Sequence, residues 1–208
     1  MTFRSRSLHR VLLLAIVLGS FAVPTDAQRF YVKLSGKVTD YFSGDPVKGV
    51  LVRVLKAGNK DMETTTRNDG TYEFTLDRGW RYAVWYSSKG MVTKHINVDT
   101  EEIPAYPDVP YYEMDVQMTM IQWIADFDFS GFDQPLGEAS FKESVHAISW
   151  DIDYTERMRP ILAKAMDEYE KTYKGYYKRK KGKLPDAPTQ WPPKAHTDTI
   201  GTGGPEKQ

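Results

Sequence analysis

Between residues 30 and 122, hydrophobic and polar side chains alternate along several short segments of the chain. In "TYEFTL", for example, Tyr72, Phe74 and Leu76 are separated by polar residues. Successive side chains of a β-strand point to opposite faces, so this period of two predicts strands with one buried face. The same pattern occurs in "YVKLSGKVTD", "VLVRVLK", "RYAVWYS", "VTKHINV" and "YYEMDVQMTM", and more weakly near "KDMETTTR".

Turn-forming residues separate these segments, as in "SGDP", "GN", "NDG" and "KG". The Asn68-Asp69-Gly70 turn supplies the positive φ that a tight hairpin needs, and so predicts a hairpin that ends in "TYEFTL". Short strands at this regular spacing are typical of an all-β sandwich. We therefore expect a mainly β fold, an antiparallel seven-stranded sandwich, over residues 28–122.

The stretch from Ser35 to Leu76 also carries an ordered set of motifs: G-x-V-x-D, a Gly/Pro turn, G-x-x-V-x-V and T-x-x-D-G-x-Y-x-F. This set resembles the carboxypeptidase regulatory-like domain, a transthyretin-like, Ig-like sandwich, and the resemblance covers about residues 33–100. It implies an accessory domain that stands beside a catalytic domain but is not one itself. The remaining residues resemble uncharacterised small exported proteins of Gram-negative envelopes. The positions that fit the motifs are Gly36, Val38, Asp40, Pro46, Gly49, Val52, Val54, Thr66, Asp69, Gly70, Tyr72 and Phe74.

The first 27 residues have the pattern of a secretory signal sequence. Three arginines precede the apolar run "VLLLAIVLGSFAV", and Thr25 and Ala27 stand at the −3 and −1 positions of a cleavage site before Gln28. The apolar run is short for a retained membrane anchor, which is the alternative. We expect an exported protein, either periplasmic or outer-membrane-associated and extracellular, with no membrane span after the signal is removed.

Three further segments follow the predicted sandwich. Residues 123–153 are aromatic and acidic without a clean period, which suggests an ordered loop packed on the sandwich. Residues 154–180 place apolar side chains at spacings of three and four, so they predict an amphipathic helix, with Asp153 and Glu156 as its capping pair. Residues 181–208 are rich in Pro, Gly and small polar residues, which is typical of a disordered tail.

Composition excludes several functions. The chain has 28 basic and 28 acidic residues, and this balance argues against a nucleic-acid-binding protein. It has no cysteine, which excludes disulfides, thiol catalysis and thiolate metal sites. No H-E-x-x-H motif is present, and no cofactor is expected.

Two weak chemical candidates remain in the sequence. Ser144, His146 and Asp151 are close in the chain, but no G-x-S-x-G motif accompanies them, so we expect no hydrolase. Asp126 and Asp128 begin like a calcium-binding loop, but the glutamate that should close the loop comes one position late. We therefore expect neither catalysis nor a metal.

Large apolar side chains at outward positions are the remaining candidates for contact with a ligand. Leu51, Leu55 and Trp85 are out of phase with the buried residues of their strands, and Trp123 opens the aromatic segment. Exposed apolar groups usually have a cover. The helix or the aromatic loop could supply it, or an envelope protein or a glycan stacked on Trp80, Trp85 or Trp123 could do so. The expected function is a non-catalytic interaction or structural module of the cell envelope, with carbohydrate binding as the alternative.

Overall fold

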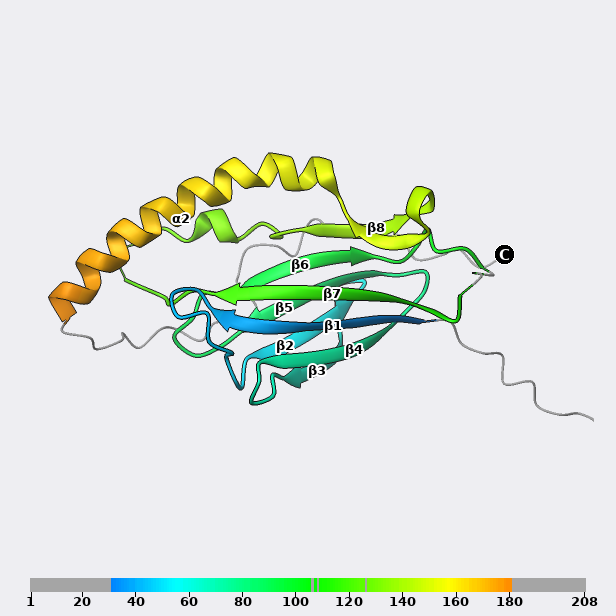
Figure 1. Ribbon diagram of the computed structural model, residues 1–208, viewed down its shortest axis with the longest axis horizontal. Helices are drawn as coiled ribbons and strands as arrows, with labels where there is room; N and C mark the ends of the chain where they lie inside the picture. The colour runs from blue at the N-terminus through cyan, green and yellow to red at the C-terminus, as the bar shows by residue number, and fades with distance from the viewer. Residues whose placement is uncertain (1–30, 106, 108, 126, 181–208) are drawn as a thin grey trace, which may run out of the picture.

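The computed structural model describes residues 31–105, 107, 109–125 and 127–180; the expected signal sequence and tail lie outside these ranges. Within the described residues, nine strands form two sheets that pack face to face, and a long helix, α2, follows them (Figure 1). The strands are β1 (Tyr31–Asp40), β2 (Leu51–Lys56), β3 (Asn59–Thr65), β4 (Thr71–Asp77), β5 (Arg81–Ser87), β6 (Lys94–Asp99), β7 (Tyr111–Met120), β8 (Glu138–Lys142) and β9 (Ala147–Trp150). The helical elements are the 3-10 turns η2 (Ser130–Phe132) and η3 (Glu143–Val145) and the α-helix α2 (Ile152–Lys180).

The fold is the mainly β sandwich that the alternation predicts, and β1 to β7 are its seven expected strands. The small sheet has the order β4-β1-β7, and the large sheet has the order β3-β2-β5-β6-β8-β9. The sheets are not antiparallel throughout, because β1 pairs with β7, and β6 with β8, in parallel. Parallel neighbours need a long crossover connection. The chain between β1 and β7 contains β2 to β6, and the chain between β6 and β8 contains β7.

The inward residues of both sheets form one core. Val32, Leu34 and Leu76 of the small sheet are fully buried, as are Val52 and Val84 of the large sheet. The alternation predicted from the sequence is therefore confirmed in the burial of these strands.

Two glycines are fixed by the backbone around them. A Cβ on Gly36 would lie 2.0 Å from the carbonyl oxygen of Val116, so only glycine lets β1 approach β7 at this point. Gly70 has a φ of +78° in the turn before β4, and a Cβ there would lie 2.5 Å from the carbonyl oxygen of Val38. The Asn68-Asp69-Gly70 turn therefore has the positive φ that the sequence predicts.

The segment from 123 to 153 differs from the loop that we expected. Its first part is irregular, but Glu138–Lys142 and Ala147–Trp150 are the strands β8 and β9, which extend the large sheet. Ala139 and Phe141 point into the core and are buried. The strands are only five and four residues long, and so their alternation is too short to stand out from the aromatic run before them.

The helix α2 begins at Ile152, and its N-terminal cap is Asp151 rather than the expected Asp153. Oδ1 of Asp151 accepts a hydrogen bond from the backbone N–H of Tyr154 at 2.7 Å. This bond satisfies one of the backbone N–H groups that have no partner within the first turn of the helix. Pro160 lies within the helix and removes one backbone donor, and α2 follows a curved path along the top of the molecule (Figure 1). None of the helices among the described residues has the length and apolar character to span a membrane.

The apolar face of α2 packs on one end of the sandwich and not on the outward residues of the sheets. We call the buried residues there the end cluster: Val92, Ile121, Ile124, Phe132 and Tyr169. Leu162, Met166 and Tyr173 of α2 pack against this cluster, together with Trp123, Phe127 and Phe129 of the loop. Tyr169 is completely buried, and its hydroxyl donates to the carbonyl oxygen of Gln122 at 2.8 Å.

Candidate functional site

The outward apolar residues predicted as contact candidates lie on the outer face of the large sheet. Leu51, Leu55 and Trp85 are half-buried, between fully buried neighbours such as Val52 and Val54. Leu51, Leu55 and Trp85 were expected to lie under α2 or the aromatic loop, but α2 and the loop pack on the end cluster, which contains none of these three residues.

Trp85 belongs to a row of side chains that crosses four strands. The register aligns Glu63 of β3, Arg53 of β2, Trp85 of β5 and His95 of β6. Arg53 Nε donates to Glu63 Oε2 at 3.1 Å, and the rings of Trp85 and His95 stack with centroids 4.0 Å apart. Since the two strands are themselves neighbours, rings stacked in this way stand upright on the sheet. Trp85 therefore does not offer a flat face to a sugar.

The other tryptophans named as stacking candidates lie apart from Trp85. The ammonium of Lys56 lies 4.4 Å from the centroid of the Trp80 ring, and Trp80 packs against the main core. Trp123 packs at the end cluster beside Phe129. The three tryptophans do not form one row on one face.

Of the two calcium candidates, Asp128 lies within the described residues, and its carboxylate stabilises a local turn. Asp126 lies outside the described residues. Asp128 Oδ1 accepts the backbone N–H of Ser130 at 2.9 Å, and Oδ2 accepts the Ser130 hydroxyl at 3.0 Å. These hydrogen bonds lower the pKa of Asp128 and explain the residue as part of a local turn.

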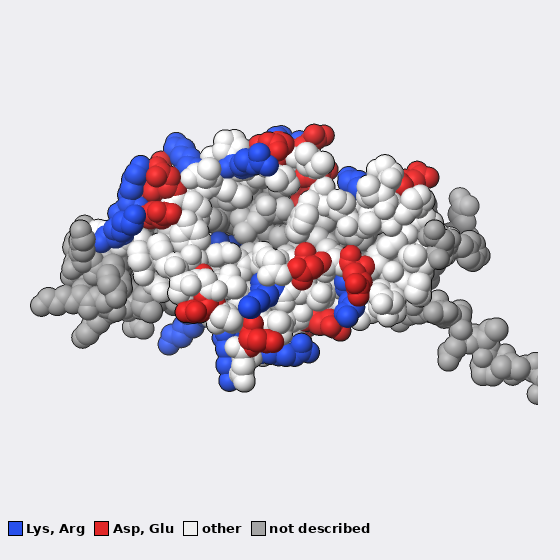
Figure 2. Space-filling view, viewed as in Figure 1, with Lys and Arg blue, Asp and Glu red and all other residues white. Residues whose placement is uncertain are grey.

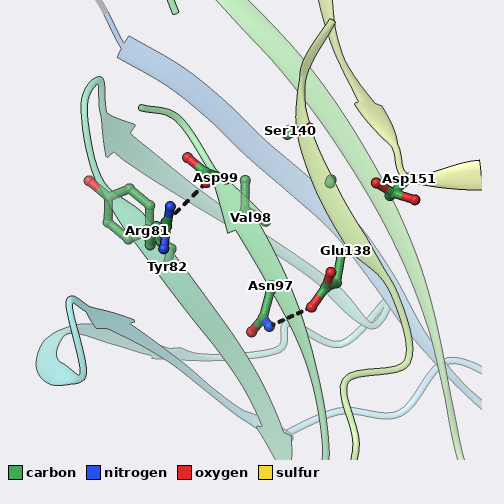
Figure 3. Close-up of a pocket in the computed structure, with 9 residues that line it drawn as sticks. Arg81, Tyr82, Asn97, Val98, Asp99, Glu138, Ser140 and Asp151 are labelled. Atoms are coloured by element: carbon green, nitrogen blue, oxygen red, sulfur yellow. Dashed lines mark hydrogen bonds and ion pairs between the residues drawn. The ribbon is translucent and has the colours of Figure 1, made fainter. Parts of the chain in front are cut away.

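A polar cleft of about 350 Å³ lies on the outer face of the large sheet, where β5, β6 and β8 run side by side (Figure 3). Its polar groups alternate with buried residues of the same strands, which places them on the outer face. The residues that line the cleft are Arg81, Tyr82, Asn97, Val98, Asp99, Glu138, Ala139, Ser140 and Asp151. A volume of this size is within the range of small-ligand sites.

Two cross-strand pairs organise the polar side chains of the cleft. Arg81 Nε donates to Asp99 Oδ2 at 3.2 Å, and its Nη2 lies 2.9 Å from Glu101 Oε2. Glu101 and then Asp99 raise the pKa of Arg81. Asn97 Nδ2 donates to Glu138 Oε1 at 3.3 Å across the parallel β6–β8 pair (Figure 3). Arg81 is thus already neutralised by two carboxylates, whereas Glu138 has an uncharged donor as its neighbour.

Asp151 connects the cleft to the start of α2. Its backbone N–H donates to the carbonyl oxygen of Glu138 at 2.7 Å, and its side chain caps the helix. Its Oδ2 lies 3.9 Å from Lys142 Nζ. The cleft therefore has a rigid border, because the strand β8 and the helix terminus are tied together at this residue.

Sequence reasoning did not single out these cleft residues. Arg81, Asn97 and Asp99 are outward polar positions of ordinary strands, and the same pattern describes any solvated face. They converge with Glu138 only because β8 pairs in parallel with β6, with Asn97 opposite Glu138 and Asp99 opposite Ser140. That pairing joins segments about 40 residues apart and has no local signal.

The two kinds of catalytic site weighed from the sequence were a metal centre and a hydrolase triad. No three or more His, Asp or Glu side chains in that part of the chain are grouped so that they could hold a metal. Of the three residues weighed as a hydrolase triad, Asp151 is the helix cap, whereas Ser144 and His146 are exposed. His146 has a φ of +47° at the turn between η3 and β9.

The family comparison covers the strands that form one side of the cleft. Residues 33–109 match the model of the carboxypeptidase regulatory-like domain. This segment is a carboxypeptidase regulatory-like domain. No curated protein sequence matches the chain.

Several solved structures are similar to parts of the chain at low sequence identity. A 3-chlorocatechol 1,2-dioxygenase from Rhodococcus opacus is 11% identical with a TM-score of 0.35, and the match covers 45% of this chain and 60% of the enzyme. The pilus 2b backbone protein of group B streptococcus is 12% identical with a TM-score of 0.32, covering 43% and 40%. A 5-hydroxyisourate hydrolase from Klebsiella pneumoniae is 14% identical with a TM-score of 0.30, covering 44% and 99%. The chain thus spans less than two thirds of the first two proteins, and these similarities carry no inference about activity.

The cleft lies at the border of the regulatory-like domain. Arg81, Asn97 and Asp99 belong to the domain, whereas Glu138 and Asp151 belong to the segment that follows it. The domain alone would present only the β5–β6 side of the cleft. The β8–β9 hairpin supplies the other side.

Proposed function

We propose that this chain is an exported, non-catalytic binding module of the bacterial cell envelope, which binds a protein partner through the polar cleft of the large sheet. The signal pattern of residues 1–27 supports export. The match of residues 33–109 to the regulatory-like domain supports a binding role rather than a catalytic one.

The observation that carries the proposal is the composition of the cleft. It is lined by the carboxylates of Asp99, Glu138 and Asp151 and by a single guanidinium, that of Arg81, which Asp99 and Glu101 already neutralise. Hydrogen-bond acceptors with negative charge therefore dominate. Such a site suits a basic side chain of a protein partner, because a charge-assisted hydrogen bond is about twice as strong as a neutral one.

A glycan is the second candidate ligand, since hydroxyl groups can also donate to carboxylates. Among the described residues, however, Trp80, Trp85 and Trp123 do not form the aromatic row that a stacking site needs, because Trp85 stands upright against His95 and the other two lie elsewhere. The geometry therefore favours a protein.

The test is a quantitative pulldown from detergent-solubilised envelope with a matched pair of variants. Glu138→Gln removes the cleft carboxylate that accepts a hydrogen bond from the Asn97 amide, whereas Glu113→Gln removes an exposed carboxylate from the outer face of the small sheet. Both variants lose one negative charge. We expect Glu138→Gln to weaken capture of a specific partner by about tenfold, the size of one charge-assisted hydrogen bond, and Glu113→Gln to leave it unchanged.

Equal capture by both variants would remove the cleft from the interaction. Retention on a glycan matrix that is lost in Glu138→Gln would favour the carbohydrate alternative. The intact mass of the native protein tests export separately, because a mature chain should begin at Gln28; a mass that includes residues 1–27 would contradict cleavage.

A further inference from the structure

The last part of α2 extends beyond the sandwich that the helix covers. Among the side chains that the structure describes, Tyr173 is the last one of α2 to pack against the end cluster, and its hydroxyl donates to Gln122 Oε1 at 2.9 Å. A Cβ on Gly175 would meet nothing within 4 Å, so this side of the helix faces open space. The helix nevertheless continues to Lys180, about 10 Å beyond Tyr173, and Figure 1 shows this end, in orange, clear of both sheets.

The sequence of this protruding end is strongly basic. We call residues 171–180 the basic end; they contain no acidic residue. Lys181 and Lys183 continue the basic run in the sequence. Outside residues 171–183 the chain has 21 basic and 28 acidic residues, so a formally neutral protein is divided into an acidic body and a basic end. The basic residues of the basic end are Lys171, Lys174, Lys178, Arg179 and Lys180.

The cations of the basic end differ in whether the helix supplies them with a carboxylate. Lys171 and Lys174 form ion pairs with acidic residues one turn earlier in the helix. For Lys178, Arg179 and Lys180, no acidic residue stands three or four positions away in either direction, so pairing along the helix cannot neutralise them. The helix dipole favours cations only in the last turn, whereas the basic run begins more than two turns earlier. The run therefore exceeds what the helix itself requires.

Aromatic residues accompany these cations. Tyr176 and Tyr177 stand within the basic end in the sequence. At its base, Phe42 is 43% exposed, and its ring stacks on Tyr173 with centroids 4.4 Å apart. Tyrosine, lysine and arginine together are typical of segments at a membrane–water interface, because aromatic rings are favoured at the level of the headgroups and cations are attracted to the lipid phosphates.

We propose that the basic end of α2 holds the protein against a bilayer surface that contains anionic phospholipids. The phosphates of the headgroups neutralise the cations for which the helix provides no acidic partner. The same surface repels the acidic body, so the molecule contacts the bilayer through the end of α2 rather than through a sheet face. A nucleic acid is a poorer match, because a long polyanion would also meet the acidic body, whereas a planar surface touches the protruding end alone.

Co-sedimentation of the protein, as isolated from cells, with lipid vesicles tests the proposal. We expect binding to phosphatidylcholine vesicles that contain about 30% phosphatidylglycerol, and no binding to phosphatidylcholine alone, because the attraction depends on the anionic lipid. Binding should weaken as the salt concentration rises from about 0.05 M to about 0.5 M, since salt screens charges at a surface.

A variant with Lys178→Gln, Arg179→Gln and Lys180→Gln loses three positive charges of the basic end. Each basic residue close to an anionic bilayer raises the affinity about fivefold, so the triple change should weaken binding at least about tenfold. Glutamine has nearly the helix propensity of lysine and arginine, and no contact with the end cluster is removed. Folding should therefore be preserved, and a thermal melt checks this.

The matched control removes three positive charges from the body instead. Lys33→Gln, Lys37→Gln and Lys60→Gln change the outer face of β1 and the strand β3. This variant has the same net charge as the triple change in the basic end, but it should bind anionic vesicles nearly as well as the natural sequence does. Glu138→Gln, the cleft variant, should also bind them normally, so a failure of the cleft and a failure of the basic end can be distinguished.

Four outcomes would overturn the proposal. The natural sequence could fail to bind anionic vesicles at low salt, or it could bind neutral vesicles equally well. The two triple variants could lose binding equally, which would show that net charge and not the basic end is responsible. Finally, the protein could bind duplex DNA and not the vesicles, which would assign the basic end to a nucleic acid.

Discussion

Lys94 is a charged residue in an apolar place. It lies on the inward side of β6 and is only 5% exposed. Its Nζ donates to the carbonyl oxygen of Thr119 at 2.7 Å and lies 5.2 Å from the centroid of the Phe132 ring. Burial disfavours the charged ammonium and lowers the pKa of Lys94 to about 8. The residue links the two sheets directly beneath the end cluster.

This lowered pKa predicts a rise in stability with pH. An unfolded lysine keeps its proton up to about pH 10.4, whereas folded Lys94 releases it near pH 8. Between these values the unfolded state binds more protons, so the free energy of unfolding increases with pH, by roughly 3 kcal/mol if the full shift is realised. Urea unfolding from pH 7 to pH 10 measures it, and Lys94→Met should flatten the dependence.

Lys37→Met is the matched control, since Lys37 lies on the outer face of the small sheet. It should leave the pH dependence of the natural sequence unchanged. A slope that persists in Lys94→Met would show that the titrating group is another residue.

At the scale of elements, α2 is the part of the chain that completes the fold. Tyr41 of the turn after β1 donates its hydroxyl to Glu170 Oε1 at 2.6 Å, and Phe42 stacks on Tyr173 with centroids 4.4 Å apart. The helix is therefore held both by the end cluster and by the β1–β2 connection. It closes one end of the sandwich.

Leu162→Asp is expected to destabilise the whole protein by a few kcal/mol. Leu162 is partly buried against the end cluster, so the change would place a carboxylate without a partner in apolar surroundings. Ile161→Asp is the matched control, because Ile161 is 51% exposed, and it should shift the melting temperature only slightly. A thermal melt compares the two. An unchanged melt for Leu162→Asp would indicate a helix that is free to bind a partner.

The elements differ in how clearly the sequence announces them. Strands such as β1 and β7 are ten residues long and alternate throughout, so their existence and buried face follow from the pattern. The helix follows from its apolar spacing, but its start at Ile152 depends on the cap at Asp151, which the Asp153–Glu156 pair obscured. β8 and β9 gain their stability from pairing with β6 and with each other, and this tertiary contribution is invisible in so few residues.

At the scale of the whole molecule, stability should not depend on a metal. Asp99 and Glu101 both form ion pairs with Arg81, and Asp128 accepts hydrogen bonds from Ser130. A ligand that binds only the folded state must raise its stability. A chelator should therefore leave the melting temperature unchanged. A fall of several degrees that calcium reverses would restore the calcium-loop interpretation of Asp126 and Asp128.

The site was much less predictable than the fold. Hydrophobic alternation within a strand determines which of its side chains face the core. The cleft depends instead on which strand lies beside β6, and the alternation does not indicate which strand that is. The net charge gives no further indication, and acidic and basic side chains are interspersed on the face that Figure 2 shows. The predicted contact residues Leu51, Leu55 and Trp85 do lie on the same sheet face as the cleft. The alternation of buried and exposed positions determines the face on which a side chain lies, but it does not determine where on that face a ligand site forms.

The place of β1 in the small sheet has a consequence for the order of folding. β1 lies between β4 and β7, and its whole length from Tyr31 to Asp40 is paired with Tyr111 to Met120. A nascent chain thus carries its first strand without one of its two neighbours until residue 120 has been made. Contacts between such distant segments slow folding, because the intervening chain must lose its freedom before the pairing can stabilise it. The small sheet, and with it the closed core, can therefore be completed only after Met120 has been made.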